Sequence, residues 1–301
     1  MLMFTQSSSA QPGAESDRPV SMGKGIVERS VNVDDARIPK IGCGTWELRG
    51  ATCAKIVAEA LKIGFRHIDT AQGYDNEAAV GDGIRESGVP REQIFVTTKV
   101  RPELLADGPL QQSVEESLNR LRITEIDLLL VHWPNPAIPL AETMRALSAT
   151  KGLGLTRNIG VSNFTIAKLD EAIRVSPEPI VAAQIEYHPY LDQSRLLAAI
   201  RRHGLAITAY CPIALGKVAQ DPRLIAIGKK HGKSAVQVTL RWLIQQDDVI
   251  AIPRTFKPER LKENLAVFDF RLTAEEMDQI SRMTTPDSRL INEPQWVPRW
   301  D

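Results

Sequence analysis

Short apolar segments alternate with helical patterns along almost the whole chain, and this alternation limits the possible folds more than any other feature. Eight segments have the length and composition of strands, at residues 41–44, 67–69, 95–99, 126–131, 158–161, 182–186, 206–210 and 249–252. Helical spacing of apolar residues fills the intervals at residues 52–63, 76–87, 109–121, 140–151, 165–174, 194–203, 222–231, 234–246, 258–266 and 273–283. The predicted N-caps are Thr165, Ser194, Ser234 and Thr273. Strands alternating with such helices form βαβ units and a parallel sheet.

Eight such units favour a closed (β/α)8 barrel over an open, doubly wound sheet. A doubly wound domain that binds a dinucleotide carries Gly-x-Gly-x-x-Gly after its first strand. The Gly-x-Gly pairs at residues 42–44 and 152–154 both lack the third glycine. We therefore predict an α/β fold of the TIM-barrel type, with an N-terminal β-hairpin over residues 26–39 and extra C-terminal helices and a loop.

The length of the chain suits one domain of this kind. With 301 residues and 43% hydrophobic content, it exceeds the ~250 residues of a typical barrel. We expect residues 26–301 to form the single domain. Residues 1–25 are rich in Ser, Gln, Ala, Gly and Pro, so we expect a disordered tail. This tail lacks the basic start and apolar core of a secretory signal.

Charge and cysteine content exclude several classes of partner. The chain has 37 basic and 37 acidic residues, and such a balance argues against nucleic acid and anionic membranes as partners. No run approaches the roughly 18 apolar residues of a membrane span. Cys43, Cys53 and Cys211 are too scattered for a disulfide framework or a zinc motif. Free thiols suit a reducing compartment, so we expect a cytoplasmic protein.

Four chemically active side chains fall at the ends of neighbouring predicted strands, where barrel active sites lie. The second strand ends in Asp69, and Tyr74 follows in its loop. The third strand ends in Lys99, and the fourth leads into His132. An ammonium beside a phenol lowers the phenol pKa, ordinarily near 10, and makes it a better proton donor. We predict that this site protonates a carbonyl oxygen while a hydride from a nicotinamide attacks the carbon.

A metal site is the alternative use of the same region. His67 and Asp69 share one face of the second predicted strand, and His132 could join them. A metal-binding barrel would carry more histidines and carboxylates at its other strand ends. We therefore predict no metal.

Three motifs resemble those of aldo-keto reductases. The first, over residues 64–81, contains GFRHIDTA followed by a Glu and a Gly. The second is RNIGVSNF at residues 157–164, and the third begins with IPRT at residue 252 and ends at residue 264. Within the family the chain most resembles the bacterial 2,5-diketo-D-gluconate reductases, through DTAQGYDNE, HWP and a terminal Trp-Asp. The resemblance covers the chain from about residue 26.

The resemblance implies a role for each matching residue. Tyr74 would donate the proton, Lys99 and Asp69 would lower its pKa, and His132 would orient the substrate. The implied NADPH-binding residues are Ser162, Asn163 and Gln184 at the nicotinamide amide, Tyr210 on its ring, Pro212, Leu215 and Gly216 at the pyrophosphate, Arg254, Thr255 and Arg260 at the 2′-phosphate, and Glu263 and Asn264 at the adenine. Two basic residues beside a phosphate favour NADPH over NADH.

The substrate pocket is the least specified part of this prediction. Trp46 and Trp133 follow strand ends, and Trp296 lies in a tail over residues 291–301 that we expect to cover the barrel mouth. The expected reaction reduces an aldehyde or ketone to an alcohol, with 2,5-diketo-D-gluconate or another small polar carbonyl compound as substrate. The alternatives are a general aldehyde or methylglyoxal reductase and an NADPH-binding sensor without turnover. The family resemblance implies a monomer.

Overall fold

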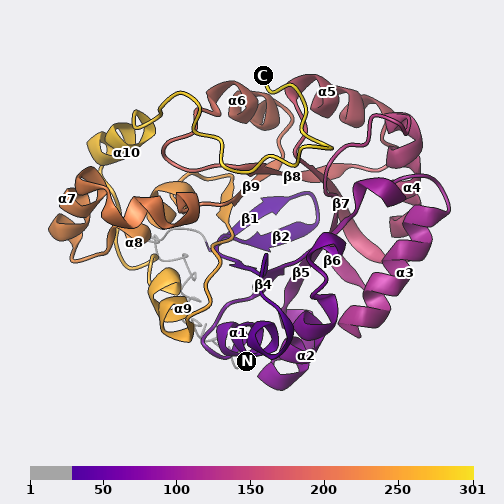
Figure 1. Ribbon diagram of the computed structural model, residues 1–301, viewed down its shortest axis with the longest axis horizontal. Coiled ribbons are helices and arrows are strands. Elements are labelled where there is room, and N and C mark those ends of the chain that lie inside the picture. Colours follow the sequence, from indigo (N-terminus) through magenta and orange to yellow (C-terminus); the bar gives the residue numbers. More distant parts are fainter. Residues whose placement is uncertain (1–28) are drawn as a thin grey trace, which may run out of the picture.

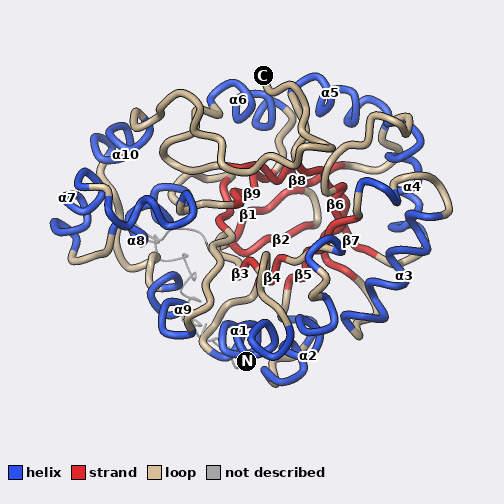
Figure 2. The backbone as a smooth tube through the Cα atoms, in the orientation of Figure 1, coloured by secondary structure: helices blue, strands red, loops and turns tan. Residues whose placement is uncertain are grey.

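Eight parallel strands curl into a barrel surrounded by helices in the computed structural model, which describes residues 29–301 (Figures 1 and 2). The strands are β3 (Cys43–Gly44), β4 (His67–Asp69), β5 (Phe95–Val100), β6 (Ile126–Val131), β7 (Thr156–Ser162), β8 (Ile180–Glu186), β9 (Ala206–Tyr210) and β10 (Val249–Ala251). Each pairs in parallel with the next in sequence. The expected disordered tail at residues 1–25 and the start of the hairpin at residue 26 lie outside the described residues.

The first and last strands close the barrel. Ile41 forms a parallel bridge with Ala251, whose amide donates to the Lys40 carbonyl at 2.8 Å. At Gly44 the backbones approach so closely that a Cβ atom would lie 2.7 Å from the Ile252 carbonyl oxygen. Only glycine fits such a contact without displacing the backbone. The predicted (β/α)8 fold is confirmed.

A hairpin covers the amino-terminal end of the barrel. Strands β1 (Ser30–Val33) and β2 (Ala36–Pro39) pair antiparallel and lie across the barrel in the view of Figure 1. Val31 and Ile38 are buried and pack with Leu128 and Ile250 from the barrel interior. This packing seals one end with apolar side chains, so the opposite end, where the strands finish, remains for a ligand.

The helices pack around the barrel and follow the expected ranges closely. They are α1 (Gly50–Lys62), α2 (Glu77–Ser87), α3 (Pro109–Leu121), α4 (Leu140–Gly152), α5 (Ile166–Val175), α6 (Ser194–Arg202), α7 (Pro222–His231), α8 (Ala235–Ile244), α9 (Pro258–Leu265) and α10 (Ala274–Ser281), with short 3-10 turns η1 (Gln72–Tyr74), η2 (Arg91–Gln93), η3 (Pro102–Leu104) and η4 (Ala214–Gln220). None of the helices within residues 29–301 is long and apolar enough to cross a membrane.

Side-chain caps set the start of three helices as predicted. Thr165, Ser234 and Thr273 each accept a hydrogen bond from the backbone N–H three residues later, which satisfies a donor that the first helical turn leaves free. The prediction for Ser194 is wrong, because it is the first residue of α6 rather than its cap. Its own amide donates instead to the Asp192 carboxylate at 2.9 Å, two residues upstream.

Candidate functional site

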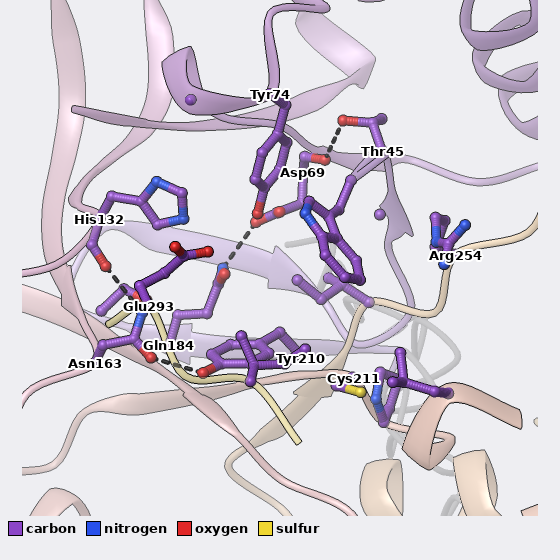
Figure 3. Close-up of a pocket in the computed structure, with 18 of the residues that line it drawn as sticks. Thr45, Asp69, Tyr74, His132, Asn163, Gln184, Tyr210, Cys211, Arg254 and Glu293 are labelled. Atoms are coloured by element: carbon purple, nitrogen blue, oxygen red, sulfur yellow. Dashed lines mark hydrogen bonds between the residues drawn. The ribbon is translucent and has the colours of Figure 1, made fainter. Parts of the chain in front are cut away.

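A cavity of about 620 Å³ opens at the carboxyl ends of the barrel strands. Every barrel strand contributes to its wall through the strand end or the loop beyond, from Trp46 after β3 to Arg254 after β10. The C-terminal segment beyond α10 supplies a further side of the wall through Ile291, Glu293 and Trp296. Figure 3 shows side chains from different strand ends, among them Tyr74, His132, Gln184 and Tyr210, converging on one space. The site therefore lies where the sequence predicts it.

Lys99 is the centre of a buried polar cluster. Its side chain has no exposed surface, and the Asp69 side chain is 2% exposed. The Lys99 ammonium donates to Asp69 Oδ1 at 2.6 Å, to the Thr70 carbonyl at 2.8 Å and to the Tyr74 hydroxyl oxygen at 3.3 Å. All three donors of the ammonium are thereby used, so its position is fixed relative to the phenol. Gln184 donates to the second Asp69 oxygen at 2.8 Å.

The pKa of the Tyr74 phenol depends on burial as well as on the neighbouring charges. Burial is the largest influence and raises the pKa of the phenol above its usual range, and Asp69 raises it further. The Lys99 ammonium lowers this pKa but does not overcome the burial. The expected lowering by Lys99 is confirmed, whereas the expected lowering by Asp69 is wrong, and burial, which the sequence did not show, raises the Tyr74 pKa overall. A raised pKa keeps the phenol protonated at neutral pH, and Lys99 still stabilises the phenolate that forms when the proton leaves.

Lys99 itself stays charged in this environment. Burial by itself would lower the pKa of an ammonium, but the adjacent Asp69 carboxylate and Tyr74 outweigh it, so the pKa of Lys99 is raised. A charged lysine inside a protein requires such a partner. The cluster thus holds one fixed positive charge next to a neutral phenol.

His132 lies beside Tyr74, with its ring 5.5 Å from the phenol ring and nearly perpendicular to it. Burial, Lys99 and Arg101 together lower the pKa of His132 well below its ordinary value. The imidazole is consequently neutral at physiological pH, and it keeps one N–H to donate to an oxygen in the cavity.

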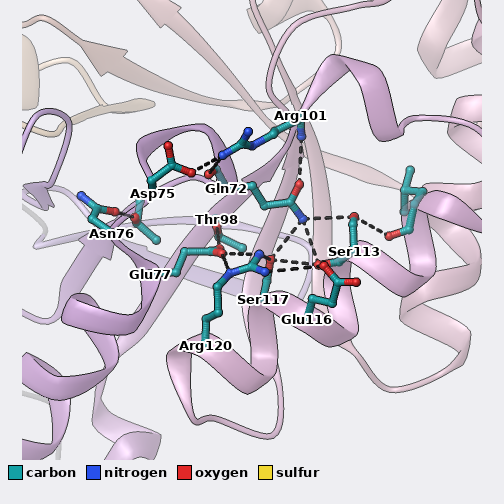
Figure 4. Close-up of polar contacts among 12 residues, drawn as sticks. Gln72, Asp75, Asn76, Glu77, Thr98, Arg101, Ser113, Glu116, Ser117 and Arg120 are labelled. Atoms are coloured by element: carbon teal, nitrogen blue, oxygen red, sulfur yellow. Dashed lines mark hydrogen bonds and ion pairs between the residues drawn. The ribbon is translucent and has the colours of Figure 1, made fainter.

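A second polar network supports the turn that carries Tyr74 (Figure 4). Gln72, in turn η1, donates to the hydroxyls of Ser113 and Ser117 on α3, each at 3.1 Å. Its carbonyl oxygen Oε1 accepts from the Arg101 amide at 3.0 Å, two residues beyond Lys99. Gln72 is 4% exposed, so these bonds join the loop after β4 to the loop after β5 inside the protein.

The predicted nicotinamide residues lie together opposite Tyr74. Asn163 adopts a left-handed backbone conformation (φ 62°), and its amide donates to the His132 carbonyl at 2.9 Å. Tyr210 donates to Asn163 Oδ1 at 2.7 Å, which holds its ring in the cavity wall. Ser162 and Gln184 line the same wall. An aromatic face with adjacent amide groups fits a flat heterocycle bearing a carboxamide.

The other end of the cavity is basic. Arg254, Thr255, Lys257 and Arg260 line it, and the loop through Pro212, Leu215 and Gly216 lies between the two ends. Basic groups at one end and an aromatic amide-lined wall at the other fit a dinucleotide phosphate. Glu263 and Asn264 do not line the cavity. Glu263 instead accepts a hydrogen bond from Ser234 at 2.6 Å, so an adenine contact for these two stays a prediction.

The three predicted substrate-pocket tryptophans all line the cavity. Trp133 is buried and lies 6.1 Å from the Trp300 ring, so the end of the chain packs against the barrel mouth. Asp301 accepts from the Ile166 amide at 2.7 Å at the start of α5. The C-terminal segment therefore crosses the mouth of the barrel, as expected.

Three functional candidates escaped the sequence analysis. Arg101 and Glu293 line the cavity, and Glu186 anchors the C-terminal segment by accepting the amide N–H groups of Leu290 at 2.7 Å and Ile291 at 3.0 Å. A carboxylate at the end of β8 was a usable signal for Glu186. Nothing local marks Glu293, because its position depends on the path of the chain.

The side chains considered for a metal are used otherwise. Both Asp69 oxygens accept hydrogen bonds from Lys99 and Gln184, and His67 Nε2 lies 3.0 Å from the Thr97 hydroxyl. Within residues 29–301, no group of three His, Cys, Asp or Glu side chains is placed to hold a metal ion.

Comparison with known proteins places these observations in a family. The model of the aldo/keto reductase family matches residues 40–284. Methylglyoxal reductase DkgB of Escherichia coli is 42% identical over 267 residues, which cover 88% of this chain and 99% of the relative. An aldo-keto reductase of Mycolicibacterium vanbaalenii is 43% identical over 245 residues, 81% of this chain and 88% of the relative.

Solved structures agree with these relatives. A crystal structure named as a 2,5-diketo-D-gluconic acid reductase B has a TM-score of 0.89 and 47% identity, and covers 91% of this chain and 97% of its own. An NADPH complex of a Gox0644 mutant has a TM-score of 0.82 and 35% identity, covering 88% of this chain and 97% of its own.

Proposed function

We propose what this chain acts on, and with which residues, from one premise: it belongs to the aldo/keto reductase family. It is an NADP(H)-dependent oxidoreductase that reduces carbonyl groups to alcohols. The observation that carries the residue assignment is the contact of the buried Lys99 ammonium with the Tyr74 hydroxyl at 3.3 Å. This contact couples a fixed charge to the acidic proton at the cavity wall.

Tyr74 donates the proton in our proposal. The raised pKa of its phenol keeps the proton available at neutral pH, and transfer to the carbonyl oxygen leaves a phenolate beside Lys99. The ammonium stabilises that phenolate at the moment it forms, while Asp69 keeps the lysine charged and oriented. Such a positioned acid contributes about 10²–10⁴-fold to the rate.

His132 and the cofactor wall position the reactants. The neutral His132 imidazole donates a hydrogen bond to the carbonyl oxygen, which aligns it with the Tyr74 hydroxyl. Ser162, Asn163 and Gln184 hold the carboxamide of the nicotinamide, and Tyr210 supports its ring. When bound, NADPH supplies the hydride that the carbonyl carbon receives.

The basic end of the cavity binds the phosphate groups of the cofactor. Arg254, Thr255 and Arg260 take the 2′-phosphate, and the loop from Pro212 to Gly216 approaches the pyrophosphate. Fixed guanidinium groups match phosphate oxygens in geometry and charge. The chain therefore uses NADPH in preference to NADH.

The substrate is a small polar carbonyl compound. Trp46, Trp133 and Trp296 enclose the region beside Tyr74 and limit the size of what enters. The relatives are named for methylglyoxal and 2,5-diketo-D-gluconic acid, and both compounds are compact molecules with adjacent oxygen functions. We propose a substrate of this class, bound by a monomer in the cytoplasm, with no nucleic acid or membrane as partner.

The test compares Tyr74→Phe with the wild type. NADPH consumption is followed by absorbance with a panel of methylglyoxal, keto-sugars and simple aldehydes, and NADPH affinity is measured by tryptophan fluorescence. We expect Tyr74→Phe to lower kcat by about 10²-fold or more while NADPH affinity changes less than about twofold, because the phenol hydroxyl is not proposed to hold the cofactor. Undiminished turnover in the variant refutes Tyr74 as the acid. Tight NADPH binding by the wild type with no consumption on any substrate favours the sensor instead.

A further inference from the structure

The carboxylate of Glu293 enters the cavity from the C-terminal segment. Figure 3 shows it projecting toward the space between His132 and Tyr74, and its negative charge acts on the Tyr74 phenol. Glu293 is exposed, and among residues 29–301 no side chain forms a hydrogen bond or ion pair with its carboxylate. An acid group without a partner thus faces the position where a carbonyl substrate is reduced.

Glu293 is held in place from both sides. Two amides shortly before it, those of Leu290 and Ile291, donate to the buried Glu186 carboxylate. Its own carbonyl oxygen accepts from the amides of Trp296 and Val297, each at 2.8 Å. These bonds hold the backbone of the turn at Glu293. From this turn the exposed Glu293 side chain contributes to the cavity wall.

The remaining charges near the substrate do not compensate for Glu293. Two guanidinium groups of the cavity wall are already paired. Arg101 bonds Asp75 and the Gln72 carbonyl, and Arg254 forms an ion pair with Glu47 at 2.8 Å. Lys99 is neutralised by Asp69 at 2.6 Å. Glu103 adds a second negative charge to the wall. Lys257 and Arg260, cations of the lining without an ion pair to any of residues 29–301, belong to the end proposed for the phosphates.

We infer that Glu293 makes this site select substrates by charge, so that neutral carbonyl compounds are reduced in preference to those carrying a carboxylate. The inference rests on the proposed function and specifies its substrate class. A substrate carboxylate would have to approach an unpaired like charge at the solvent-accessible mouth of the cavity, and this repulsion, reduced by water and ions, is unfavourable. A neutral substrate avoids this repulsion, and its hydroxyl groups can donate to the Glu293 oxygens.

This selection separates the two substrates after which the relatives are named. Methylglyoxal is neutral, whereas 2,5-diketo-D-gluconate carries a carboxylate at physiological pH. The charge of Glu293 favours the methylglyoxal type, that is, neutral aldehydes, dicarbonyls and keto-sugars. The same argument predicts poor reduction of 2-keto acids and of aldehydes with a nearby carboxylate.

The test uses two aldehydes of nearly equal shape, 4-formylbenzamide and 4-formylbenzoate, which differ by one charge. Wild type, Glu293→Gln and the control Glu115→Gln are compared by kcat/KM. Glu115 is exposed on α3 and does not line the cavity, so the control removes the same charge elsewhere. We expect Glu293→Gln to raise kcat/KM for 4-formylbenzoate at least about fivefold and to change that for 4-formylbenzamide less than about twofold. The control should match the wild type.

Two further measurements separate this inference from the proposed function. Higher salt should narrow the gap between the two aldehydes in the wild type, because ions screen the repulsion. Binding of both aldehydes to the enzyme with NADP+, followed by tryptophan fluorescence, should show the same charge preference without turnover. If the wild type reduces neither these two aldehydes nor any compound of the panel above, the proposed function fails, and the binding measurement still tests the inference. The decisive quantity is the ratio of kcat/KM, or of affinity, for 4-formylbenzoate to that for 4-formylbenzamide. If this ratio is the same in Glu293→Gln and Glu115→Gln, the inference is refuted while the proposed function stands.

Discussion

A single buried ammonium determines the chemistry available at the residue scale. The Lys99 side chain has no exposed surface, and its ammonium donates one hydrogen bond each to Asp69, Thr70 and Tyr74. The arrangement costs desolvation energy and is retained only with good geometry around both charges. That cost is consistent with a group kept for its effect on the phenol rather than for stability alone.

Replacing Lys99 by Met should therefore damage both activity and stability. We expect kcat to fall by about 10²-fold or more, since the phenolate loses its stabilising charge. We also expect the free energy of unfolding to fall by about 3–5 kcal/mol, because Asp69 is left buried without a counter-charge. Urea unfolding and steady-state kinetics measure the two effects.

The double variant Lys99→Met with Asp69→Asn serves as the control for this prediction. Removing both charges should recover much of the lost stability and none of the lost activity. A double variant that recovers activity along with stability would show that Lys99 acts only as a structural residue.

At the scale of elements, the site depends on how two loops are joined. Tyr74 lies in η1 after β4, and Lys99 lies near the end of β5. Gln72 connects them by bonds to the Arg101 amide and to Ser113 and Ser117 on α3. A buried amide whose donors and acceptor are all used fixes the geometry of its surroundings. Gln72 is thus a positioning residue for the phenol.

Replacing Gln72 by Leu should disturb the position of Tyr74 without disturbing the binding of substrate or NADPH. The Tyr74 turn loses its attachment to α3, so we expect kcat to fall about tenfold or more while the KM for substrate and the NADPH affinity change less than about threefold. The matched control is Gln112→Leu on α3, since that side chain is exposed and its hydrogen bond is to the exposed Glu116. An equal loss of kcat in both variants would contradict a positioning role for Gln72.

At the scale of the whole molecule, the end of the chain completes the cavity. The segment beyond α10 crosses the barrel mouth, where Glu186 holds the amides of Leu290 and Ile291. Arg289 lies 3.7 Å from the centre of the Trp300 ring, and Asp301 binds the Ile166 amide. A strand end, the first turn of α5 and the last residue are thereby linked across the substrate side of the site.

Loosening this attachment should affect substrate binding more than cofactor binding. In Glu186→Gln the hydrogen bonds to the segment lose their charge assistance, about 1.5–3 kcal/mol for a charged acceptor. We expect faster tryptic cleavage after Arg289 and a larger rise in the KM for substrate than in the Kd for NADPH, because the segment lines the cavity through Ile291, Glu293 and Trp296. Glu178→Gln is the control, since Glu178 forms an exposed ion pair with Lys151. Equal cleavage rates in the two variants would count against the anchor.

Most of the fold was predictable because it follows from local patterns. The strand ranges agree within two residues at each end, as for β8, predicted at 182–186 and observed at Ile180–Glu186. The greatest shortening is in β3, where Ile41 contributes only an isolated bridge at the barrel closure. The wrong cap at Ser194 arose because a nearby Asp192 competes for the same role.

The sequence by itself determined the alternation of strands and helices, and it placed an acid, an amine, a phenol and an imidazole at neighbouring strand ends, because both depend on short-range spacing along the chain. Only the tertiary structure decided that burial outweighs Lys99 in setting the Tyr74 pKa, because desolvation depends on every group packed around the phenol. The position of Glu293 at the cavity wall is likewise a tertiary result, since the segment that carries it is anchored at Glu186, more than a hundred positions away.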